Sequence, residues 1–353
     1  MSSYTEQRQK HLTLMMREIL NELPSYLFDF FRGIEHTTSM NTRLAYAYDL
    51  RLFFEYLYKD YPDCKRLSHM REISLSLIEK LTPRDLELYL EYLTYYEKEN
   101  EGEAYGISHQ NGQKGKARKL SSLKSFYRYF YKQQRILNNP SLLVDMPKIS
   151  EKPIVKLDVD EVARLLDTIE DGEALTDHQK RYHVYTRTRD LALISLLLGT
   201  GIRVSECVGL NIEDVDFNYN GIRITRKGGN ETIIYFGEEV ERALQDYLVQ
   251  REEKICKEED TPLFLSMQNK RMSVRSVQLL VKKYSQLVTQ LKTITPHKLR
   301  STYGTTLYQE TGDIYLVADV LGHKDVNTTK KHYAQMDDAR RRMAASIVKL
   351  RED

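Results

Sequence analysis

Apolar residues recur at the spacing of amphipathic helices through about the first 145 residues of the chain. One stripe begins near Thr42, and its apolar members are Leu44, Ala47, Tyr48, Leu52, Phe53 and Tyr56. A further helix is expected to begin at Thr82, because Pro83 follows it and proline fits the first turn of a helix. The pattern predicts a helical first half.

The segment from residue 116 to residue 134 predicts a helix with two chemically different faces. Its apolar stripe consists of Leu120, Leu123, Tyr127, Phe130 and Tyr131. Its opposite face places short hydroxyl side chains between cations, and its members are Arg118, Ser121, Ser122, Ser125, Arg128 and Lys132. Small residues let a helix approach a duplex while Arg and Lys reach the phosphates, so this face suits nucleic acid. An ordinary solvated face is the alternative.

Helical periodicity is lost around residues 148–157, near Pro147 and Pro153, and this stretch is expected to be a linker. A capped helix is predicted to begin near Asp158. A polar insertion at residues 170–188 then leads into the most apolar helix of the chain.

One segment of the second half carries a clear strand signal. Two β-prone runs, residues 222–225 and 232–236, flank a turn at residues 228–230. The second half is therefore predicted to be mainly helical with a small antiparallel sheet.

Bulk properties narrow the class of protein. A length of 353 residues suggests two domains, and 41% apolar with 29% charged residues is typical of a soluble globular protein. No run approaches the roughly 20 apolar residues of a membrane span. The first residues are too polar for a secretory signal, so a cytoplasmic location is expected. Cys64, Cys207 and Cys256 lack metal-ligand spacing and suit a reducing compartment.

The position of the charges is more informative than the net charge of +2. Residues 104–144 contain no acidic residue and eight basic ones, which predicts a local positive surface. The candidate DNA contacts on this segment are Lys116, Arg118, Lys119, Ser122 and Arg128.

Four motifs of the second half hold residues that can act together on a phosphate. They are GTGIRVSEC with Arg203, TRKGGNE with Lys227, TPHKLRS with His297 and Arg300, and LGHKDVNTTKKHYA with His323 and Tyr333. In order and spacing they resemble the tyrosine recombinase family, also called the phage integrase family. The resemblance covers the chain from about residue 158 to its end, and more weakly the first half, which resembles that family's core-binding domain.

The resemblance implies a mainly α fold in two parts that close on DNA as a C-shaped clamp. A helical-bundle core-binding domain is expected at residues 1–147 and a linker at residues 148–157. An α+β catalytic domain with a small antiparallel sheet is expected at residues 158–353.

The residue types fit the chemistry of the resemblance. Two guanidiniums, Arg203 and Arg300, can grip one phosphodiester through parallel hydrogen bonds and keep their charge as negative charge builds on the phosphorus. His297 and His323 would add donors, and His297 is also a candidate to accept the proton of the attacking hydroxyl. Taken singly, each arginine could be a surface or ion-pair residue. The joint match of two arginines, a lysine, two histidines and a tyrosine in this order is far more specific evidence for the family.

Tyr333 is the expected nucleophile, joined through its oxygen to the 3′ end of the cut strand. Lys227, at the hairpin turn, is the expected general acid for the leaving 5′ oxygen. Glu206 is expected to orient Arg203, with a plain surface carboxylate as the alternative. No cofactor is expected, because the ester stores the bond energy and no GxxxxGK[ST] loop is present. The histidines have no HxxxH spacing, so no metal is expected.

The resemblance also implies partners. Met343, Ile347 and Leu350 share one helical face after Tyr333, and in the family this segment docks on a neighbouring protomer. A double-stranded recombination site, self-association to a dimer and a tetramer on DNA, and an accessory protein that sets direction are therefore candidate partners; no membrane is. The role stays open between Xer-type resolution of chromosome dimers and integration of a phage or transposon. A silent DNA-binding regulator and a type IB topoisomerase are further alternatives.

Overall fold

Two units make up the chain in its computed structural model, Ser2–Glu151 and Lys152–Asp353. The structure describes residues 4–98, 107–150, 154–226, 229–252, 261–323, 325–327 and 329. Buried apolar residues form a separate core in each unit. Within these residues, no helix is both long and apolar enough to cross a lipid bilayer.

Helices build the amino-terminal unit, as the periodicity predicts. They are α1 (Tyr4–Asn21), α2 (Tyr26–Gly33), α3 (Met40–Asp60), α4 (Leu75–Lys80), α5 (Pro83–Tyr92) and α6 (Gln113–Lys132). Short polar side chains set the starts of the two helices that the sequence marked. The Ser39 hydroxyl accepts from the Thr42 amide at the start of α3, and Thr82 and Asp85 form a reciprocal capping box at α5.

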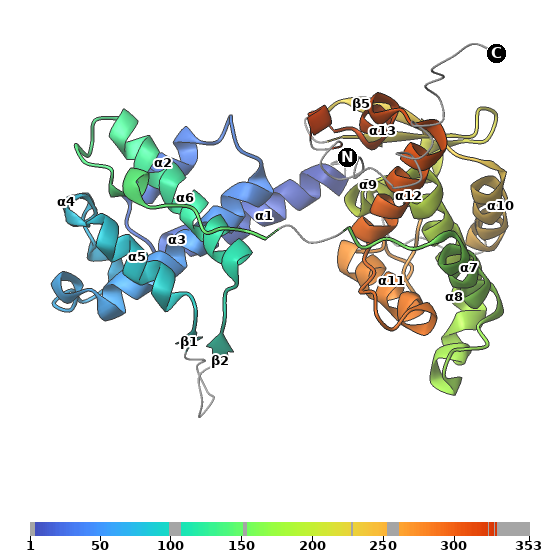
Figure 1. The fold of residues 1–353 in the computed structure, drawn as a ribbon, viewed down its shortest axis with the longest axis horizontal. Helices are drawn as coiled ribbons and strands as arrows, with labels where there is room; N and C mark the ends of the chain where they lie inside the picture. The colour runs from blue at the N-terminus through green and yellow to red at the C-terminus, as the bar shows by residue number, and fades with distance from the viewer. Residues whose placement is uncertain are drawn as a thin grey trace, which may run out of the picture. The chain divides into compact units, whose positions relative to one another are not determined.

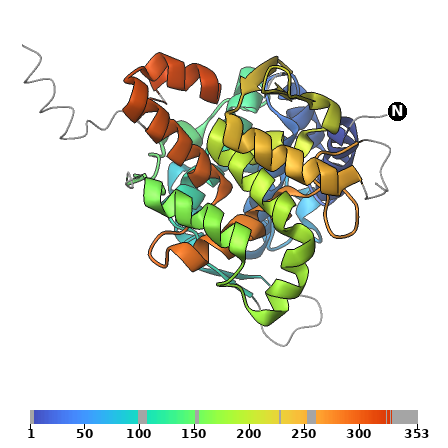
Figure 2. The same ribbon diagram turned by 90° about the vertical axis from the view of Figure 1, so that its right-hand side faces the viewer.

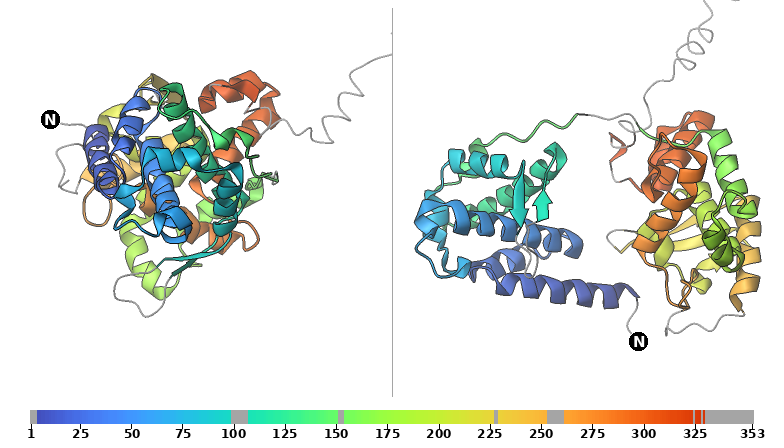
Figure 3. Two further views of the ribbon diagram at one scale, coloured as in Figure 1. Left: turned by 90° about the vertical axis from the view of Figure 1, so that its left-hand side faces the viewer. Right: turned by 90° about the horizontal axis from the view of Figure 1, so that it is seen from below.

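Aromatic rings fill the core between α2, α3 and α6. Phe126 of α6 lies 5.8 Å from Phe30 and 6.2 Å from Phe54, centroid to centroid, in edge-to-face pairs. Leu120, Leu123, Tyr127 and Phe130 are buried as predicted, but Tyr131 is 48% exposed. Figure 3 shows α6 lying against α3 and α2 in this unit. The apolar stripe of α6 therefore includes Phe126 rather than Tyr131.

A two-stranded antiparallel sheet in this unit was not predicted. Its strands are β1 (Tyr96–Lys98) and β2 (Ile107–His109), with Glu97 opposite Ser108. Figure 1 shows both strands at one edge of the helical unit. Three-residue strands are too short to display an alternating pattern, so the sequence carries no periodic signal for them.

The carboxy-terminal unit is mainly helical around one long central helix. Its helices are α7 (Val159–Asp171), α8 (Asp177–Thr200), α9 (Val204–Gly209), α10 (Glu238–Glu252), α11 (Val274–Val288), α12 (Pro296–Thr311) and α13 (Ile314–Leu321). Helix α8 packs against α10, α7 and α12. Figure 2 shows α10 lying along α8.

The starts of α7 and α8 can be compared with those that the sequence predicted. Asp158 caps α7 as predicted, in a reciprocal box with Glu161. The polar stretch at residues 170–188 is not a separate insertion before an apolar helix, because Thr176 and Gln179 form a capping box that starts α8 within it. A solvated first half lengthens α8, and its apolar second half is buried.

The predicted hairpin is present and has a third strand beside it. Strands β4 (Gly221–Thr225) and β5 (Glu231–Tyr235) pair antiparallel, with Ile222 opposite Ile234. The added strand is β3 (Val215–Asp216), so the order is β3-β4-β5. The mainly α fold with a small antiparallel sheet is therefore confirmed.

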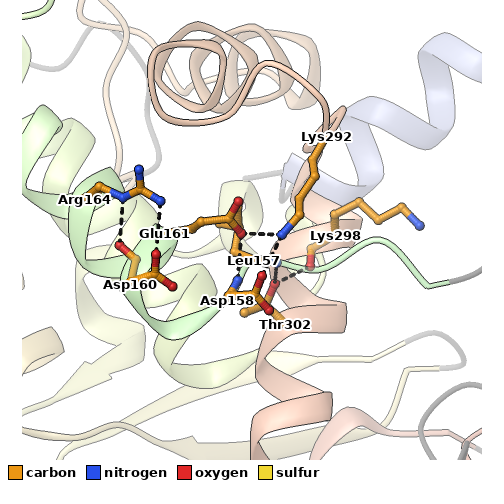
Figure 4. A network of polar contacts seen from close by, with 8 residues as sticks. All are labelled: Leu157, Asp158, Asp160, Glu161, Arg164, Lys292, Lys298 and Thr302. Atoms are coloured by element: carbon orange, nitrogen blue, oxygen red, sulfur yellow. Dashed lines mark hydrogen bonds and ion pairs between the residues drawn. The ribbon is translucent and has the colours of Figure 1, made fainter.

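Polar contacts fix the start of this unit against α12. The Leu157 amide donates to the Thr302 hydroxyl at 3.0 Å, and that hydroxyl donates to the Lys298 carbonyl at 3.0 Å (Figure 4). The Lys292 ammonium, just before α12, lies 2.9 Å from an Asp158 oxygen and 2.5 Å from a Glu161 oxygen. The cap of α7 and the helix that carries His297 and Arg300 are thus held together.

Candidate active site

The carboxyl end of α13 is the centre of the candidate site. The last four carbonyls of an α-helix have no partner within the helix, and they form the negative end of its dipole. Here the carbonyls of residues 319–322 accept hydrogen bonds from arginine side chains of three other elements. Three side chains that are distant in sequence therefore meet at one helix end.

Arg203 reaches this point from the turn after α8. Gly201 ends α8 with a left-handed φ of +62°, and Arg203 occupies the cap position of α9. Its guanidinium donates to the Gly322 carbonyl at 3.3 Å and to a Glu206 oxygen at 2.8 Å. The second Glu206 oxygen accepts from the Arg203 amide at 2.8 Å. The expected contact between Glu206 and Arg203 is therefore present, and the carboxylate is almost buried.

Arg300 reaches the same point from the second turn of α12. Only 4% of this residue is exposed. One guanidinium nitrogen donates to the Gly201 carbonyl at 2.7 Å, and the other donates to the Leu321 carbonyl. Arg300 and Arg203 thus bind the carbonyls of two consecutive residues, Leu321 and Gly322. The pair that the sequence predicted is brought together.

The two predicted histidines differ in how closely the structure ties them to this pair. His323 follows Gly322 directly; its amide donates to the Ala318 carbonyl at 2.9 Å, and its Nδ1 lies 2.7 Å from the Thr329 hydroxyl. His323 is thus held at the same helix end as the arginines. His297 lies exposed on the first turn of α12, three residues before Arg300.

Two predicted residues, Lys227 and Tyr333, lie outside the described residues, as do Met343, Ile347 and Leu350. Their roles stay predictions. The nearest described positions before them are Arg226 and Thr329, and Thr329 is fully buried.

Arg226 is a residue of this site that the sequence reasoning did not select. It follows β4, and its guanidinium donates to the Asp319 carbonyl at 3.0 Å and to the Val320 carbonyl at 2.7 Å. Burial lowers the pKa of Arg226; the Glu206 carboxylate opposes this shift and the Arg203 charge adds to it. The only sequence signal was a second basic residue beside Lys227, and hairpin cations are usually solvated.

This arrangement is suited to binding a single phosphate-like anion. Arginine guanidiniums keep their charge at any physiological pH and present several donors in fixed directions. Arg203 and Arg300 bind consecutive carbonyls at the end of α13, and His323 lies at the same helix end. Within the described residues, no group of three acidic, cysteine or histidine side chains could hold a metal ion.

The predicted DNA-binding face of α6 is corrected at Ser122 and Lys119, which are buried. Ser122 is fully buried and donates to the Lys119 carbonyl at 2.7 Å, and Lys119 is only 8% exposed. Arg118 makes a bidentate ion pair with buried Asp49, at 2.7 Å and 2.6 Å, and the Lys119 ammonium lies 3.8 Å from the same carboxylate. Ser122 and Lys119 are therefore interior residues rather than surface contacts. Arg118 and Lys119 serve a buried carboxylate that needs charged partners, and the DNA-contact prediction for Arg118, whose side chain is 49% exposed, stays a prediction.

The other two candidates on α6 are consistent with a contact surface. Arg128 is exposed, and Lys116 is half-buried with its ammonium 2.7 Å from the Thr94 hydroxyl. The prediction for these two positions stays open.

Comparison with known proteins connects this geometry to a family. The model of the phage integrase family matches residues 156–340. A tyrosine recombinase XerC of Caldanaerobacter subterraneus is 34% identical over 96% of this chain and 90% of its own length. A tyrosine recombinase XerD of Staphylococcus epidermidis is 30% identical over 85% of this chain and 90% of its own.

Solved structures show the same fold. The XerH site-specific recombinase bound to its difH substrate matches with a TM-score of 0.61 at 21% identity, over 98% of this chain and 97% of that one. The Tn1549 transposon integrase in complex with circular intermediate DNA also matches with a TM-score of 0.61, at 23% identity over 89% of this chain and 97% of that one.

Proposed function

The chain belongs to the phage integrase family, the tyrosine recombinases, and on that premise we propose that it cuts and rejoins double-stranded DNA through Tyr333. The contact of Arg203 and Arg300 with the consecutive carbonyls of Gly322 and Leu321 carries the proposal, because both permanently charged side chains bind the same helix end. The enzyme is a site-specific recombinase, as are its curated relatives.

In the proposed reaction, Arg203 and Arg300 bind the non-bridging oxygens of one phosphodiester. The attacking oxygen makes phosphorus transiently five-coordinate and adds negative charge to these oxygens, so fixed guanidiniums stabilise the transition state more than the ground state. Glu206 holds Arg203 by a charge-assisted hydrogen bond and thereby limits its motion. His323 and His297 add donors to the same phosphate, and His297 is the candidate acceptor of the tyrosine proton.

The covalent step exchanges one ester for another. The Tyr333 oxygen attacks phosphorus and loses its proton, the bond from phosphorus to the 5′ oxygen breaks, and Lys227 gives a proton to that oxygen. The products are a 3′-phosphotyrosyl end and a free 5′ hydroxyl. Attack by a 5′ hydroxyl of another strand reverses these changes, so rejoining needs no nucleotide cofactor.

Xer-type resolution of chromosome dimers is the proposed biological role. Relatives named XerC and XerD match this chain over most of its length at 28–34% identity, which supports this role over phage or transposon integration. We further propose a clamp of the two units on DNA, two protomers at each site and four in the synapse, joined through the segment after Tyr333. An accessory protein that sets direction belongs to the same proposal.

A nicked suicide substrate tests the chemistry. A nick next to the cleavage position lets the short 5′-hydroxyl fragment diffuse away, so the covalent complex accumulates. The wild-type protein should migrate as a DNA adduct in a denaturing gel, whereas Tyr333→Phe should bind the same DNA and form none. Tyr315→Phe is the matched control, because Tyr315 is 71% exposed on α13 and should still form the adduct. An adduct with Tyr333→Phe would contradict the proposal.

A further inference from the structure

Arg226 joins the β4–β5 hairpin to the carboxyl end of α13. Its amide donates to the Asn230 carbonyl at 2.8 Å and its carbonyl accepts from the Gly229 amide at 3.0 Å, so its backbone is fixed at the base of the turn. Its side chain spans to α13 and binds the consecutive carbonyls of Asp319 and Val320. One residue therefore connects two elements of the site. Figure 1 shows β5 and α13 at the same end of the unit.

The contact depends on a glycine at position 322. Gly322 ends α13 with a φ of +63°, a backbone conformation that side chains other than glycine rarely adopt. A Cβ atom added there would lie 1.7 Å from Nη1 and 2.4 Å from Cζ of Arg226. The guanidinium is thus packed directly on the backbone of the residue between Leu321 and His323. Because His323 follows Gly322 directly, we expect a displacement of the Arg226 guanidinium to alter the position of His323.

Burial of the Arg226 guanidinium carries a desolvation cost, which the nearby Glu206 carboxylate partly offsets. Arg226 is half-buried beside Arg203, and within the described part of the chain its buried Nε has no hydrogen-bond partner. Like charges in a partly buried site repel one another. The negative end of the α13 dipole offsets part of this repulsion, since carbonyls of residues 319–322 face all three guanidiniums.

We propose that Arg226 is a positioning residue for strand cleavage, holding the end of α13 so that His323 meets the phosphate that Arg203 and Arg300 bind. This inference rests on the proposed function of those three residues. The role inferred for Arg226 is exercised through α13, whose Asp319 and Val320 carbonyls its guanidinium binds. The alternative is that the Arg226 contact only stabilises the fold, and the experiment must distinguish this role from positioning.

Three variants perturb the contact in different ways. Arg226→Met keeps the aliphatic stem and removes both hydrogen bonds, and Arg226→Lys keeps the charge with a single ammonium in place of the planar fork. Gly322→Ala keeps the arginine and displaces it. Arg223→Met is the matched control, because Arg223 lies on β4, the strand that Arg226 follows. Its side chain is 54% exposed and, within the described residues, pairs with Asp214.

The measurement is the single-turnover rate of adduct formation on the nicked substrate at saturating DNA, with the DNA dissociation constant measured separately. Misplacing a catalytic group by about 1 Å can cost about a hundredfold in rate, so Arg226→Met and Gly322→Ala should be slower by about ten- to a hundredfold. The dissociation constant should change by less than about threefold, because many phosphate contacts share the binding. Arg226→Lys should be intermediate and Arg223→Met should match the wild type.

A double-mutant cycle with His323→Ala separates positioning from stability. If Arg226 acts by placing His323, the double variant should be about as slow as His323→Ala alone; independent roles would multiply the two losses. The inference would be overturned if the rate losses of Arg226→Met and His323→Ala multiplied in the double variant. A wild-type rate in Arg226→Met or Gly322→Ala would also overturn it, as would a wild-type rate in His323→Ala when Arg226→Met is slow. If Arg226→Met does not fold, Arg226→Lys carries the same cycle. Adduct formation by Tyr333→Phe would overturn the proposed function instead.

Discussion

A variant of Arg118 can distinguish a structural role from a DNA-binding role for this residue of α6. Its guanidinium makes two hydrogen bonds to Asp49, which is 2% exposed. Burial raises the pKa of the Asp49 carboxyl, and the charges of Arg118 and Lys119 oppose that shift. Replacing Arg118 by Met would leave the carboxylate with one cation, Lys119, at 3.8 Å. We expect Arg118→Met to destabilise the amino-terminal unit.

The size of the effect follows from how deeply the pair is buried. Removing one partner of a fully buried ion pair costs about 3–5 kcal/mol. The Arg118 side chain is 49% exposed and Lys119 remains, and exposed pairs are worth far less. These two features reduce the expected loss to about 2 kcal/mol. The double variant Asp49→Asn, Arg118→Met should recover part of this loss, because it removes the buried charge.

The assay must report on one unit, since a chain of two units need not unfold in a single step. Hydrogen exchange with mass spectrometry meets this need: peptides from α3 and α6 should exchange faster in Arg118→Met, while peptides from α8 should not change. Arg128→Met is the matched control on the same helix, because Arg128 is exposed and should leave exchange unaltered.

DNA titrations at several salt concentrations complete the test. Loss of one phosphate contact lowers the slope of log K against log salt by about 0.9. We expect that change for Arg128→Met and an unchanged slope for Arg118→Met under conditions where both are folded. Unchanged exchange together with a lowered slope for Arg118→Met would refute the structural role assigned to the ion pair of Arg118 with Asp49.

Two further predictions follow from single contacts. Glu206→Gln should slow adduct formation by about tenfold with little change in DNA affinity, because a neutral amide holds Arg203 less firmly; a wild-type rate would show that Arg203 needs no support. Gly172→Ala should lower the unfolding free energy of the carboxy-terminal unit by about 1–3 kcal/mol, because Gly172 has a φ of +67° and its Cβ would lie 2.5 Å from His183. Exchange in α7 and α8 peptides at the wild-type rate would contradict this.

Sequence patterns predicted the helices well where caps and periodicity agreed. Thr82 with Pro83, and Asp158 with Glu161, are short polar caps whose partners lie within three residues, so the information is local. Strand β3 and the β1–β2 pair were missed, since strands of two or three residues show no alternation. Ser122 was misassigned because its hydroxyl bonds to a carbonyl of its own helix, which lets a polar residue occupy the core.

The candidate site was predictable in its residue types but not in how they are held. The motifs supplied Arg203, Arg300 and His323, and the structure brings these three together. Their common anchor is a set of backbone carbonyls, which no side-chain pattern can reveal. Arg226 was overlooked for the same reason, because its partners are the carbonyls of Asp319 and Val320.

The central claim is that one particular phenol takes up the DNA strand. The chain has 25 tyrosines, so the position of the covalent bond is a demanding test. The adduct from the nicked substrate can be digested with nuclease and protease, and the peptide that carries the remaining nucleotide can be sequenced by mass spectrometry. The account predicts the nucleotide on the peptide that contains Tyr333. A nucleotide on any other tyrosine, or no covalent nucleotide on a protein that binds its site, would contradict it.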